Sequence, residues 1–236
     1  MAELPFLVAL AHHKYGIASR IGRKIARHAD GVGPWKRHLV GARVGDSGET
    51  AESSRTTTAP TRFVERHAML AEAGWFLAGN RVLLSESFTR RALADGMALH
   101  AWGALSWARA WLTRDANRLM PLVSLGDGAW RKRQPDRWEG VKTCNLSAWR
   151  RDLVAVNGLD ESYTGWGMED SDLVVRLRRA GVRHKSARFA APVFHLWHRE
   201  NDRSRLPENQ ARLREVLSST QVRSRVGLDQ YSSVAP

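Results

Sequence analysis

The chain of 236 residues has little cysteine, little lysine and no long apolar run. Its single cysteine, Cys144, excludes an internal disulfide and agrees with a reducing compartment. No apolar run approaches the roughly 20 residues that span a bilayer. The stretch from Leu4 to Ala11 is too short, and lacks the basic leader, for a signal peptide. We therefore expect a cytoplasmic protein without a transmembrane helix.

Lysine is scarce although the chain is strongly basic. The formal net charge is +13, and only six of the 37 basic residues are lysine, the others being arginine. Such a surface attracts polyanions, so nucleic acid, an anionic membrane face and the diphosphate of a sugar nucleotide are candidate partners. Because the arginines are scattered rather than interleaved with aromatics in one patch, a solvated surface is the simpler interpretation. Charge alone selects no partner.

The rest of the composition indicates a folded α/β protein. Hydrophobic residues make up 43% of the chain and include ten tryptophans, which is enough for a buried core. The pattern over 75–84 predicts a buried strand broken or bulged at Gly79. Before it, Phe63, His67 and Leu70 fall on one face of a short helix. We expect further strands over 6–10, 182–187 and 192–197, and helices over 17–28, 85–99 (capped by Ser85 or Ser87), 101–120 and 169–180. Residues 202–215 should begin as a loop and continue as an amphipathic helix.

Two segments in the middle of the chain carry clusters of one residue type. Trp102, Trp107 and Trp111 recur within 101–120 and predict core positions or a lid helix. Residues 127–140 are rich in arginine without a strong period, which predicts a solvated loop. A mobile basic loop near a diphosphate is the alternative for this second segment.

One stretch stands out, in which Gly165 and Gly167 bracket Trp166. Backbone without a Cβ can turn sharply or approach a ligand closely, so the tryptophan should sit on a bend. The turn signal Asn157-Gly158 precedes this bend. The stretch therefore predicts an aromatic side chain presented by a loop.

A carboxylate cluster follows the bend directly. Glu169, Asp170 and Asp172 lie in the first turn of a helix that should end near Gly181. Acids at a helix start are stabilised by the macrodipole and can cap free N–H groups, worth about 0.3 to 1 kcal/mol each. An aromatic directly before such a cluster also suits stacking on a sugar ring while a carboxylate takes a proton from its hydroxyl. Spacing alone leaves both interpretations open.

Three strings carry a resemblance to a known family. They are Asn157-Gly-Leu-Asp-Glu161, Gly165-Trp-Gly-Met-Glu-Asp-Ser-Asp172 and His195-Leu-Trp-His198. Together they strongly resemble the C-terminal half of inverting sugar-nucleotide glycosyltransferases, in the family-2-like group whose C-terminal segment is similar to that of galactosyltransferases. The resemblance runs from about residue 61 to 216. It implies an α/β, GT-A-like nucleotide-sugar transferase fold, a mixed sheet flanked by helices, with the N-terminal half incomplete.

The resemblance also implies roles on the acceptor side. The expected reaction moves a sugar from a nucleotide-sugar donor to a hydroxyl of a carbohydrate acceptor, with inversion. Asp170 would act as general base on the acceptor hydroxyl, and Trp166 would stack on the acceptor ring. Gly167 would belong to the same acceptor site, while Glu169 and Asp172 would orient the acceptor or the helix start.

On the donor side, the resemblance places Cys144 and Asn145 beside the donor sugar. A small buried apolar residue is the alternative for Cys144. His195 and His198 are candidate ligands of Mn²⁺ or Mg²⁺, with Mn²⁺ suited better by imidazole and carboxylate. Histidines three apart point to opposite faces of a continuous strand, so both bind one ion only if the strand ends near Leu196.

The N-terminal part departs from the family pattern. The family should carry an acidic Asp-x-Asp type metal motif before Thr61, whereas Asp30, Asp46 and Glu49 are isolated. Residues 31–60 are rich in Gly, Ser, Thr and Ala, and 50–60 indicate a linker. We therefore expect weak or absent activity from the chain as given.

The sequence thus predicts three parts. Residues 1–60 form an irregular segment and linker, 61–217 an acceptor and catalytic domain, and 218–236 a frayed tail. Two other functions stay open. A non-catalytic remnant that binds carbohydrate is favoured by the missing acidic motif, and a basic nucleic-acid-binding protein is favoured by charge alone. Peripheral association with the inner face of an anionic membrane is a further expectation.

Overall fold

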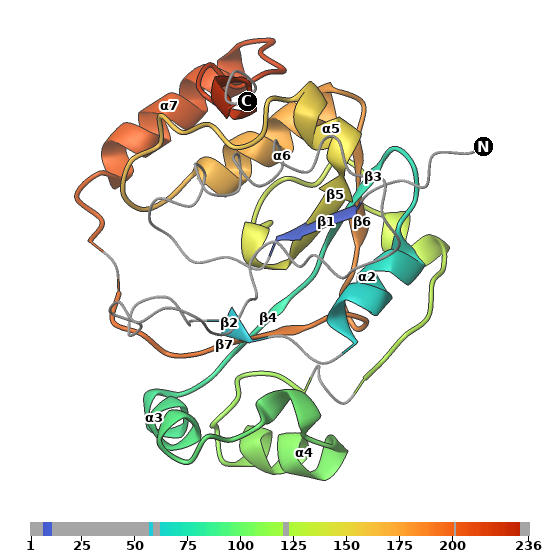
Figure 1. The fold of residues 1–236 in the computed structure, drawn as a ribbon, viewed down its shortest axis with the longest axis vertical. Helices are drawn as coiled ribbons and strands as arrows, with labels where there is room; N and C mark the ends of the chain where they lie inside the picture. The colour runs from blue at the N-terminus through green and yellow to red at the C-terminus, as the bar shows by residue number, and fades with distance from the viewer. Residues whose placement is uncertain (1–6, 11–56, 59–61, 120–122, 201, 232–236) are drawn as a thin grey trace.

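The computed structural model describes residues 7–10, 57–58, 62–119, 123–200 and 202–231. Two small sheets follow one another along the length of the molecule (Figure 1). The four-stranded sheet lies near the middle, and the three-stranded sheet lies between it and helices α3 (Glu86–Ala94) and α4 (Ala104–Leu112). The predicted α/β class with a mixed sheet is confirmed.

The four-stranded sheet has the order β1-β5-β3-β6. Its strands are β1 (Leu7–Leu10), β5 (Leu146–Trp149), β3 (Trp75–Ala78) and β6 (Arg183–Ser186). The pairs β1–β5 and β3–β5 are antiparallel, and β3–β6 is parallel. The strands expected over 6–10 and 182–187 are thereby confirmed.

The three-stranded sheet has the order β2-β7-β4. Its strands are β2 (Thr57–Thr58), β7 (Val193–His195) and β4 (Arg81–Leu83). β2 runs antiparallel to β7, and β4 runs parallel to it. The strand expected over 192–197 is confirmed, but β2 falls where we predicted linker, because residues 57–58 pair with β7. The helix expected over 17–28 and the remainder of 1–60 lie outside the described residues.

Gly79 lies where the chain passes from one sheet to the other. The strand predicted over 75–84 is divided there into β3 and β4, as the glycine indicated. A Cβ at position 79 would lie 2.4 Å from Nδ2 of Asn145, so no larger residue fits without displacing that amide. The backbone N–H of Gly79 also donates to the Asn145 carbonyl, 2.8 Å away. Residues from both sheets therefore meet at Asn145.

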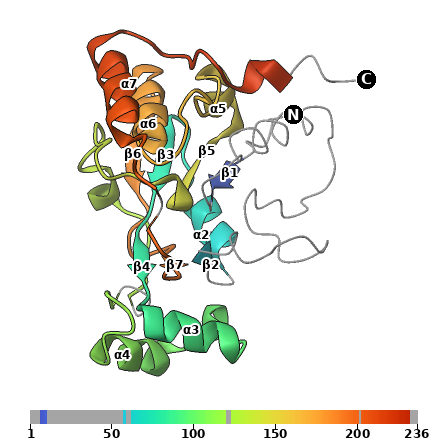
Figure 2. The ribbon, with the colours of Figure 1, turned by 90° about the vertical axis from the view of Figure 1, so that its left-hand side faces the viewer.

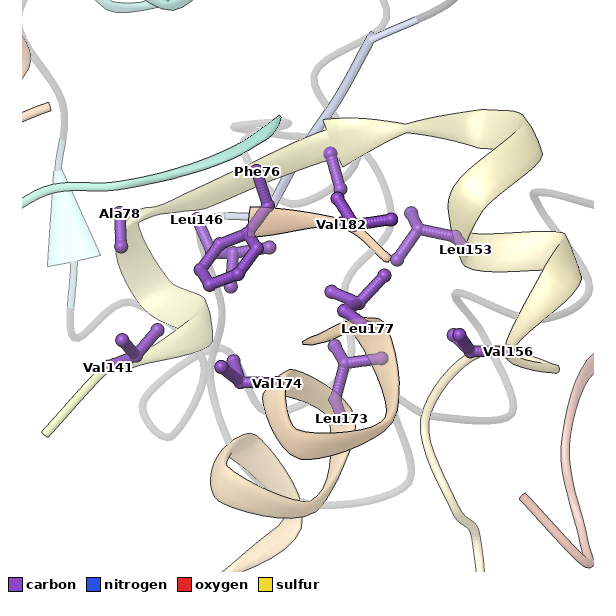
Figure 3. Packing of buried hydrophobic residues seen from close by; sticks show 11 residues of the cluster. Phe76, Ala78, Val141, Leu146, Leu153, Val156, Leu173, Val174, Leu177 and Val182 are labelled. Carbon is purple, nitrogen blue, oxygen red and sulfur yellow. The ribbon is translucent and has the colours of Figure 1, made fainter. Parts of the chain in front are cut away.

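The four-stranded sheet is covered on both faces. Side chains alternate along a strand, so Phe76 and Ala78 face one way and Leu77 the other. On the first face the apolar side of α6 (Glu169–Arg179) packs with α5 (Arg150–Ala155), as Figure 3 shows. On the second face Leu77 packs against Leu70 of α2 (Phe63–Leu70). Residues of the first-face core include Phe76, Leu146, Leu153, Leu173, Val174 and Leu177.

Helix α2 brings a buried histidine to the second face of this sheet. His67 is fully buried, and its Nδ1 and Nε2 lie 2.7 Å from Ser147 Oγ and 3.1 Å from Asn145 Oδ1. Because the amide oxygen of Asn145 can only accept, we assign the proton to Nε2. Burial lowers the pKa of His67 to about 4. The ring is therefore neutral at pH 7.

The three-stranded sheet packs against α3 and α4 through aromatic side chains. Val82 of β4 and Phe194 of β7 are register partners and belong to this second core. The Trp107 ring of α4 stacks on Phe194 with centroids 4.2 Å apart and an interplanar angle of 17°. Trp107 is thus a core residue as predicted, whereas Trp111 is exposed.

Helix α3 begins at the predicted cap but ends early. The Ser85 Oγ accepts from the Phe88 backbone N–H at 3.2 Å. The helix ends at Ala94 instead of near residue 99, because Gly96 adopts a left-handed φ of 60°. A short 3₁₀ turn, Leu99–Ala101, then leads to α4. None of the described helices is long and apolar enough to cross a membrane.

The segment 127–140 is largely exposed, as predicted for a solvated loop, but one of its arginines is buried. Arg131, within the 3₁₀ helix Ala129–Lys132, is fully buried. Its guanidinium lies 4.2 Å from the Trp130 ring centroid and donates only to backbone carbonyls. The acceptors are Leu125, Gly126, Ser186 and Arg188, at 2.6 to 3.0 Å. Arg131 therefore fastens this segment to the end of β6.

The C-terminal part folds back on the sheet's first face. Helix α7 (Leu206–Ser218) packs on α6, and Figure 2 shows them together at one end of the molecule, opposite α3 and α4. We expected residues from 218 on to fray, but Ser224 is buried and donates from Oγ to the Asn157 carbonyl at 2.8 Å. The 3₁₀ helix Leu228–Tyr231 continues this contact through the Leu228 N–H. Residues 232–236 lie outside the described residues.

Candidate active site

The bend before α6 is built as the glycines predicted. Gly165, Gly167 and Met168 have positive φ values of 72°, 107° and 75°. A Cβ at Gly167 would lie 3.1 Å from the Leu206 side chain, and one at Gly165 would lie 3.1 Å from that of Arg205. Close packing against the start of α7 thus adds to the conformational reason for glycine at both positions.

Trp166 is half-buried on this bend. The Arg203 guanidinium lies 4.8 Å from its ring centroid, within cation–π range. The buried amide of Asn209 donates to the carbonyls of Thr164, at 3.0 Å, and Trp166, at 3.3 Å. These contacts fix the backbone on either side of the tryptophan, so its ring is held in a defined orientation with part of its surface accessible.

Asp170 lies at the second position of α6 and is largely buried. Its Oδ1 accepts a hydrogen bond from the hydroxyl of Thr143. Thr143 begins the 3₁₀ helix Thr143–Asn145, which contains both residues expected beside the donor. The expected base and the expected donor-side segment therefore lie side by side, although 27 residues separate them in the sequence.

Asp172 has different surroundings, although it is only two residues further on. It is fully buried, and its Oδ2 accepts from Nε and Nη2 of Arg176 at 3.0 and 2.6 Å. Nη1 of the same arginine donates to the carbonyls of Val156 and Gly158, at 2.6 and 2.8 Å. This geometry favours the helix-start role of Asp172 over an acceptor contact, since it ties α6 to the preceding turn.

Glu169 and Gly167 complete the residues expected around the acceptor. Glu169 is half-buried at the first position of α6, and Gly167 is buried beneath α7. Of the three acids in this turn, Glu169 is the most exposed. Contact of either residue with an acceptor stays a prediction.

Cys144 and Asn145 are both buried. Burial raises the pKa of the Cys144 thiol to about 12, with Asp170 acting in the same direction and the cations Arg81 and Lys142 in the opposite one. The thiol is therefore protonated at pH 7, in keeping with the small apolar alternative. The three charged groups lie close enough to the sulfur to affect its ionisation.

Asn145 connects three segments of backbone. Its Nδ2 donates to the Asn80 carbonyl at 2.9 Å and to the Ala191 carbonyl at 2.7 Å, while Oδ1 accepts from His67. The amide is fully used in these contacts. Asn145 therefore positions the chain around the site, and a direct donor contact by its side chain stays a prediction.

His195 and His198 lie close together, as a shared ion would require. β7 ends at His195, which is the condition under which histidines three apart can approach one point, and the two ring centroids are 5.2 Å apart. The Nδ1 of His198 donates to the Arg199 carbonyl at 2.8 Å, which puts the lone pair on Nε2. Within the described residues, however, no group of three or more His, Cys, Asp or Glu side chains could hold a metal ion.

The sequence did not point to several residues that shape the site. Thr143 hydrogen-bonds to the expected base, Arg203 covers the tryptophan, and Asn209 holds the bend. Each lies far along the chain from the residue it contacts, so no local pattern connects them. The string Cys-Asn-Leu-Ser was the nearest available signal, because Thr143 immediately precedes it.

Comparisons with known proteins agree with the motifs. A family model described as the N-terminal domain of galactosyltransferase matches residues 129–199. A comparison with curated proteins found no match. The matched range holds Thr143, Asp170 and both histidines, and it supports a glycosyltransferase-type segment and a glycosyltransferase-type function in general. It does not include 61–128, over which the motifs also suggested a resemblance.

Proposed function

We propose that the protein transfers a sugar from a nucleotide-sugar donor to a hydroxyl of a carbohydrate acceptor, with inversion, on a GT-A-like fold. The hydrogen bond between Thr143 and Asp170 carries this proposal, because it holds the expected base against the segment expected beside the donor. The similarity of residues 129–199 to a galactosyltransferase family supports the general type of reaction.

The proposed reaction assigns one step to each of these side chains. The acceptor ring stacks on the accessible part of Trp166, with Glu169 and Gly167 at the edge of the same bend. The acceptor oxygen attacks the anomeric carbon, and its proton passes to the Asp170 carboxylate. The bond between the anomeric carbon and the diphosphate oxygen breaks, and the electron pair leaves with the diphosphate. Thr143 holds Asp170 in place for the proton transfer.

A divalent ion forms part of the proposal. Mn²⁺ or Mg²⁺ bound by His195 and His198 would supply positive charge to the departing diphosphate. The described residues provide these two imidazoles and no carboxylate group that would complete the coordination sphere. Weak binding of such an ion is therefore expected.

We also propose peripheral contact with an anionic membrane through α4. The helix buries Trp107 and Ala110, and its opposite face carries Leu105 and Leu112, which are 85% and 72% exposed. Arg109 lies between these two leucines on the same face, at helical spacing. Exposed leucines beside an arginine suit the boundary of an anionic bilayer.

The experiment for the transfer reaction replaces the base. In Asp170→Asn the shape is kept and the basicity is lost, so turnover with a panel of nucleotide sugars and oligosaccharide acceptors should fall by about 10² to 10⁴-fold. Asp95→Asn, at an exposed acid at the end of α3, is the matched control and should keep the parental rate. Thermal unfolding of both variants checks that the fold is intact.

Two outcomes would contradict this assignment. Near-full turnover of Asp170→Asn together with loss in Glu169→Gln would move the base to Glu169. Carbohydrate binding without transfer, from every donor tested with the parent chain, would favour the non-catalytic alternative.

A further inference from the structure

Arg81 and His195 share one face of the three-stranded sheet. In the parallel pair of β4 and β7, Arg81 is the register partner of Val193 and Leu83 that of His195. Side chains alternate along a strand, and Val82 and its partner Phe194 point into the second core. Arg81 and His195 therefore occupy the opposite face, two register positions apart, with the Val82–Phe194 pair between them.

Arg81 and Lys142 differ from the buried cations of this protein. Arg131, Arg176 and Lys185 each bind several carbonyl or carboxylate oxygens. By contrast, the side chains of Arg81 and Lys142 make no hydrogen bond or ion pair with another residue in the described part of the chain, and both are partly exposed. Among the residues that the structure describes, these two cations have no counter-ion, so we treat them as candidates for binding an anion.

Both cations lie beside the Thr143–Asn145 segment. Lys142 directly precedes it, and the carbonyl of Asn80, the neighbour of Arg81, accepts from the Asn145 amide at 2.9 Å. The same segment holds Asp170 through Thr143. Arg81, Lys142 and Asp170 also lie close enough to Cys144, at the centre of the segment, for their charges to shift the pKa of its thiol. These two cations and the expected base therefore flank the same short helix.

We propose that Arg81, assisted by Lys142, binds the diphosphate of the donor and stabilises it as the leaving group. The inference rests on the proposed transfer reaction and identifies the part of the donor that this protein's own side chains hold. As the anomeric carbon–oxygen bond breaks, negative charge grows on the diphosphate oxygen, while the acceptor proton moves to Asp170. A guanidinium presents two parallel N–H donors to such an anion. It supplies positive charge on the His195 side of the site whether or not an ion is bound there.

Calorimetric titration of the 236-residue chain with pyrophosphate and with uridine diphosphate, in the presence of EDTA, tests the proposal. Arg81→Gln should weaken binding of both ligands by about tenfold or more, the loss expected for a charge-assisted hydrogen bond. Lys142→Gln should weaken it by a smaller factor. Arg214→Gln removes the same charge from an exposed position on α7 and should change binding less than twofold.

A further variant and a further ligand distinguish a diphosphate site from a general anion site. Arg81→Lys keeps the charge and loses the paired donors, so it should fall between the parent and Arg81→Gln. Equal loss with inorganic phosphate would indicate a general anion site rather than a diphosphate site and would overturn the proposal. Binding that appears only with Mn²⁺ and is unchanged in Arg81→Gln, or no diphosphate binding by the parent, would overturn it too.

Failure of the transfer reaction would look different. If Arg81→Gln loses diphosphate binding while Asp170→Asn keeps full turnover, the diphosphate site stands and the assignment of the base fails. If Asp170→Asn is inactive while Arg81→Gln binds diphosphate as the parent does, the base stands and the role of Arg81 is rejected.

Discussion

The two sheets of this protein are held by different kinds of interaction. Around the four-stranded sheet, buried charged groups are held by ion pairs and hydrogen bonds, as in the Asp172–Arg176 pair and in Lys185, whose Nζ lies 2.7 Å from Asp127. Around the three-stranded sheet, the buried contacts are aromatic, led by the stack of Trp107 on Phe194. Hydrogen bonds are directional and apolar packing is not. The first arrangement positions individual atoms, and the second mainly supplies stability.

This difference accounts for where the candidate site lies. Asp170 and its neighbours belong to the polar side, where Thr143 donates a hydrogen bond to the Asp170 carboxylate. The aromatic contacts lie on the face of the three-stranded sheet that packs against α3 and α4. The opposite face of α4 exposes Leu105 and Leu112. Substitutions on the two sides should therefore differ in their effects, and three predictions test the contrast directly.

The largest effect is expected from breaking the buried ion pair of the polar side. Arg176→Ala leaves Asp172 buried without its partner and frees two carbonyls, so the free energy of unfolding should fall by about 3 to 5 kcal/mol. Arg90→Ala is the matched control, because the Arg90–Glu86 pair is on the surface, with side chains 72% and 45% exposed. It should change stability by less than about 1 kcal/mol. Urea unfolding of both variants measures the difference, and equal small losses would contradict the contrast.

An intermediate effect is expected from acid, through His67 at the junction of the two sheets. Its folded pKa of about 4 lies below the unfolded value of about 6.5, so between these values the unfolded state binds a proton that the folded state does not. The contribution of neutral His67 to the free energy of unfolding is therefore complete above about pH 6.5. It is lost as the pH drops toward 4, by on the order of 3 kcal/mol in total.

Chemical unfolding at several pH values in this window gives the measurement. His67→Gln has no titrating ring, so its stability should depend less steeply on pH than that of the parent. Carboxylates titrate in both proteins, which is why the difference between the two curves is the relevant quantity. Parallel curves would contradict the prediction, because they would show that folding does not lower the pKa of His67.

The smallest effect is expected on the aromatic side, at its exposed helix. Leu105→Ser and Leu112→Ser should each weaken binding to vesicles rich in anionic lipid by on the order of 1 kcal/mol, since part of a leucine side chain leaves the bilayer. Their unfolding free energy should stay at the parental value, because both residues are exposed. Cosedimentation with anionic and with neutral vesicles checks this, and unchanged binding to the anionic vesicles would remove α4 as the membrane contact.

Much of the fold was accessible from local patterns. Some features depend on the conformation of only one or two residues, so the local sequence is enough to predict them. These are the division at Gly79, the cap at Ser85 and the turn at Asn157-Gly158. The early end of α3 was missed because its apolar spacing continues beyond Gly96. The conformation of that glycine outweighs the spacing.

The site was predictable only in part, because its connections are long-range. The motif marked Asp170 and Trp166 but gave no sign that Asp172 is fully buried, since adjacent acids look alike in a sequence. Arg131 looked like one of many solvated arginines, and only the fold shows four carbonyls converging on it. Two of those carbonyls, of Ser186 and Arg188, lie 55 and 57 residues further along the chain, so no local pattern indicates them.

The hydrogen bonds of the Asn145 amide bear on how rigid the site is before substrates bind. By joining the Asn80 and Ala191 carbonyls to the start of β5, it leaves the two sheets little freedom to rotate against each other. The site would then be preorganised before donor and acceptor bind. The loss of conformational entropy needed to order it would occur during folding and not on binding. For this protein, we expect substrate capture to proceed without a large hinge motion between the two sheets.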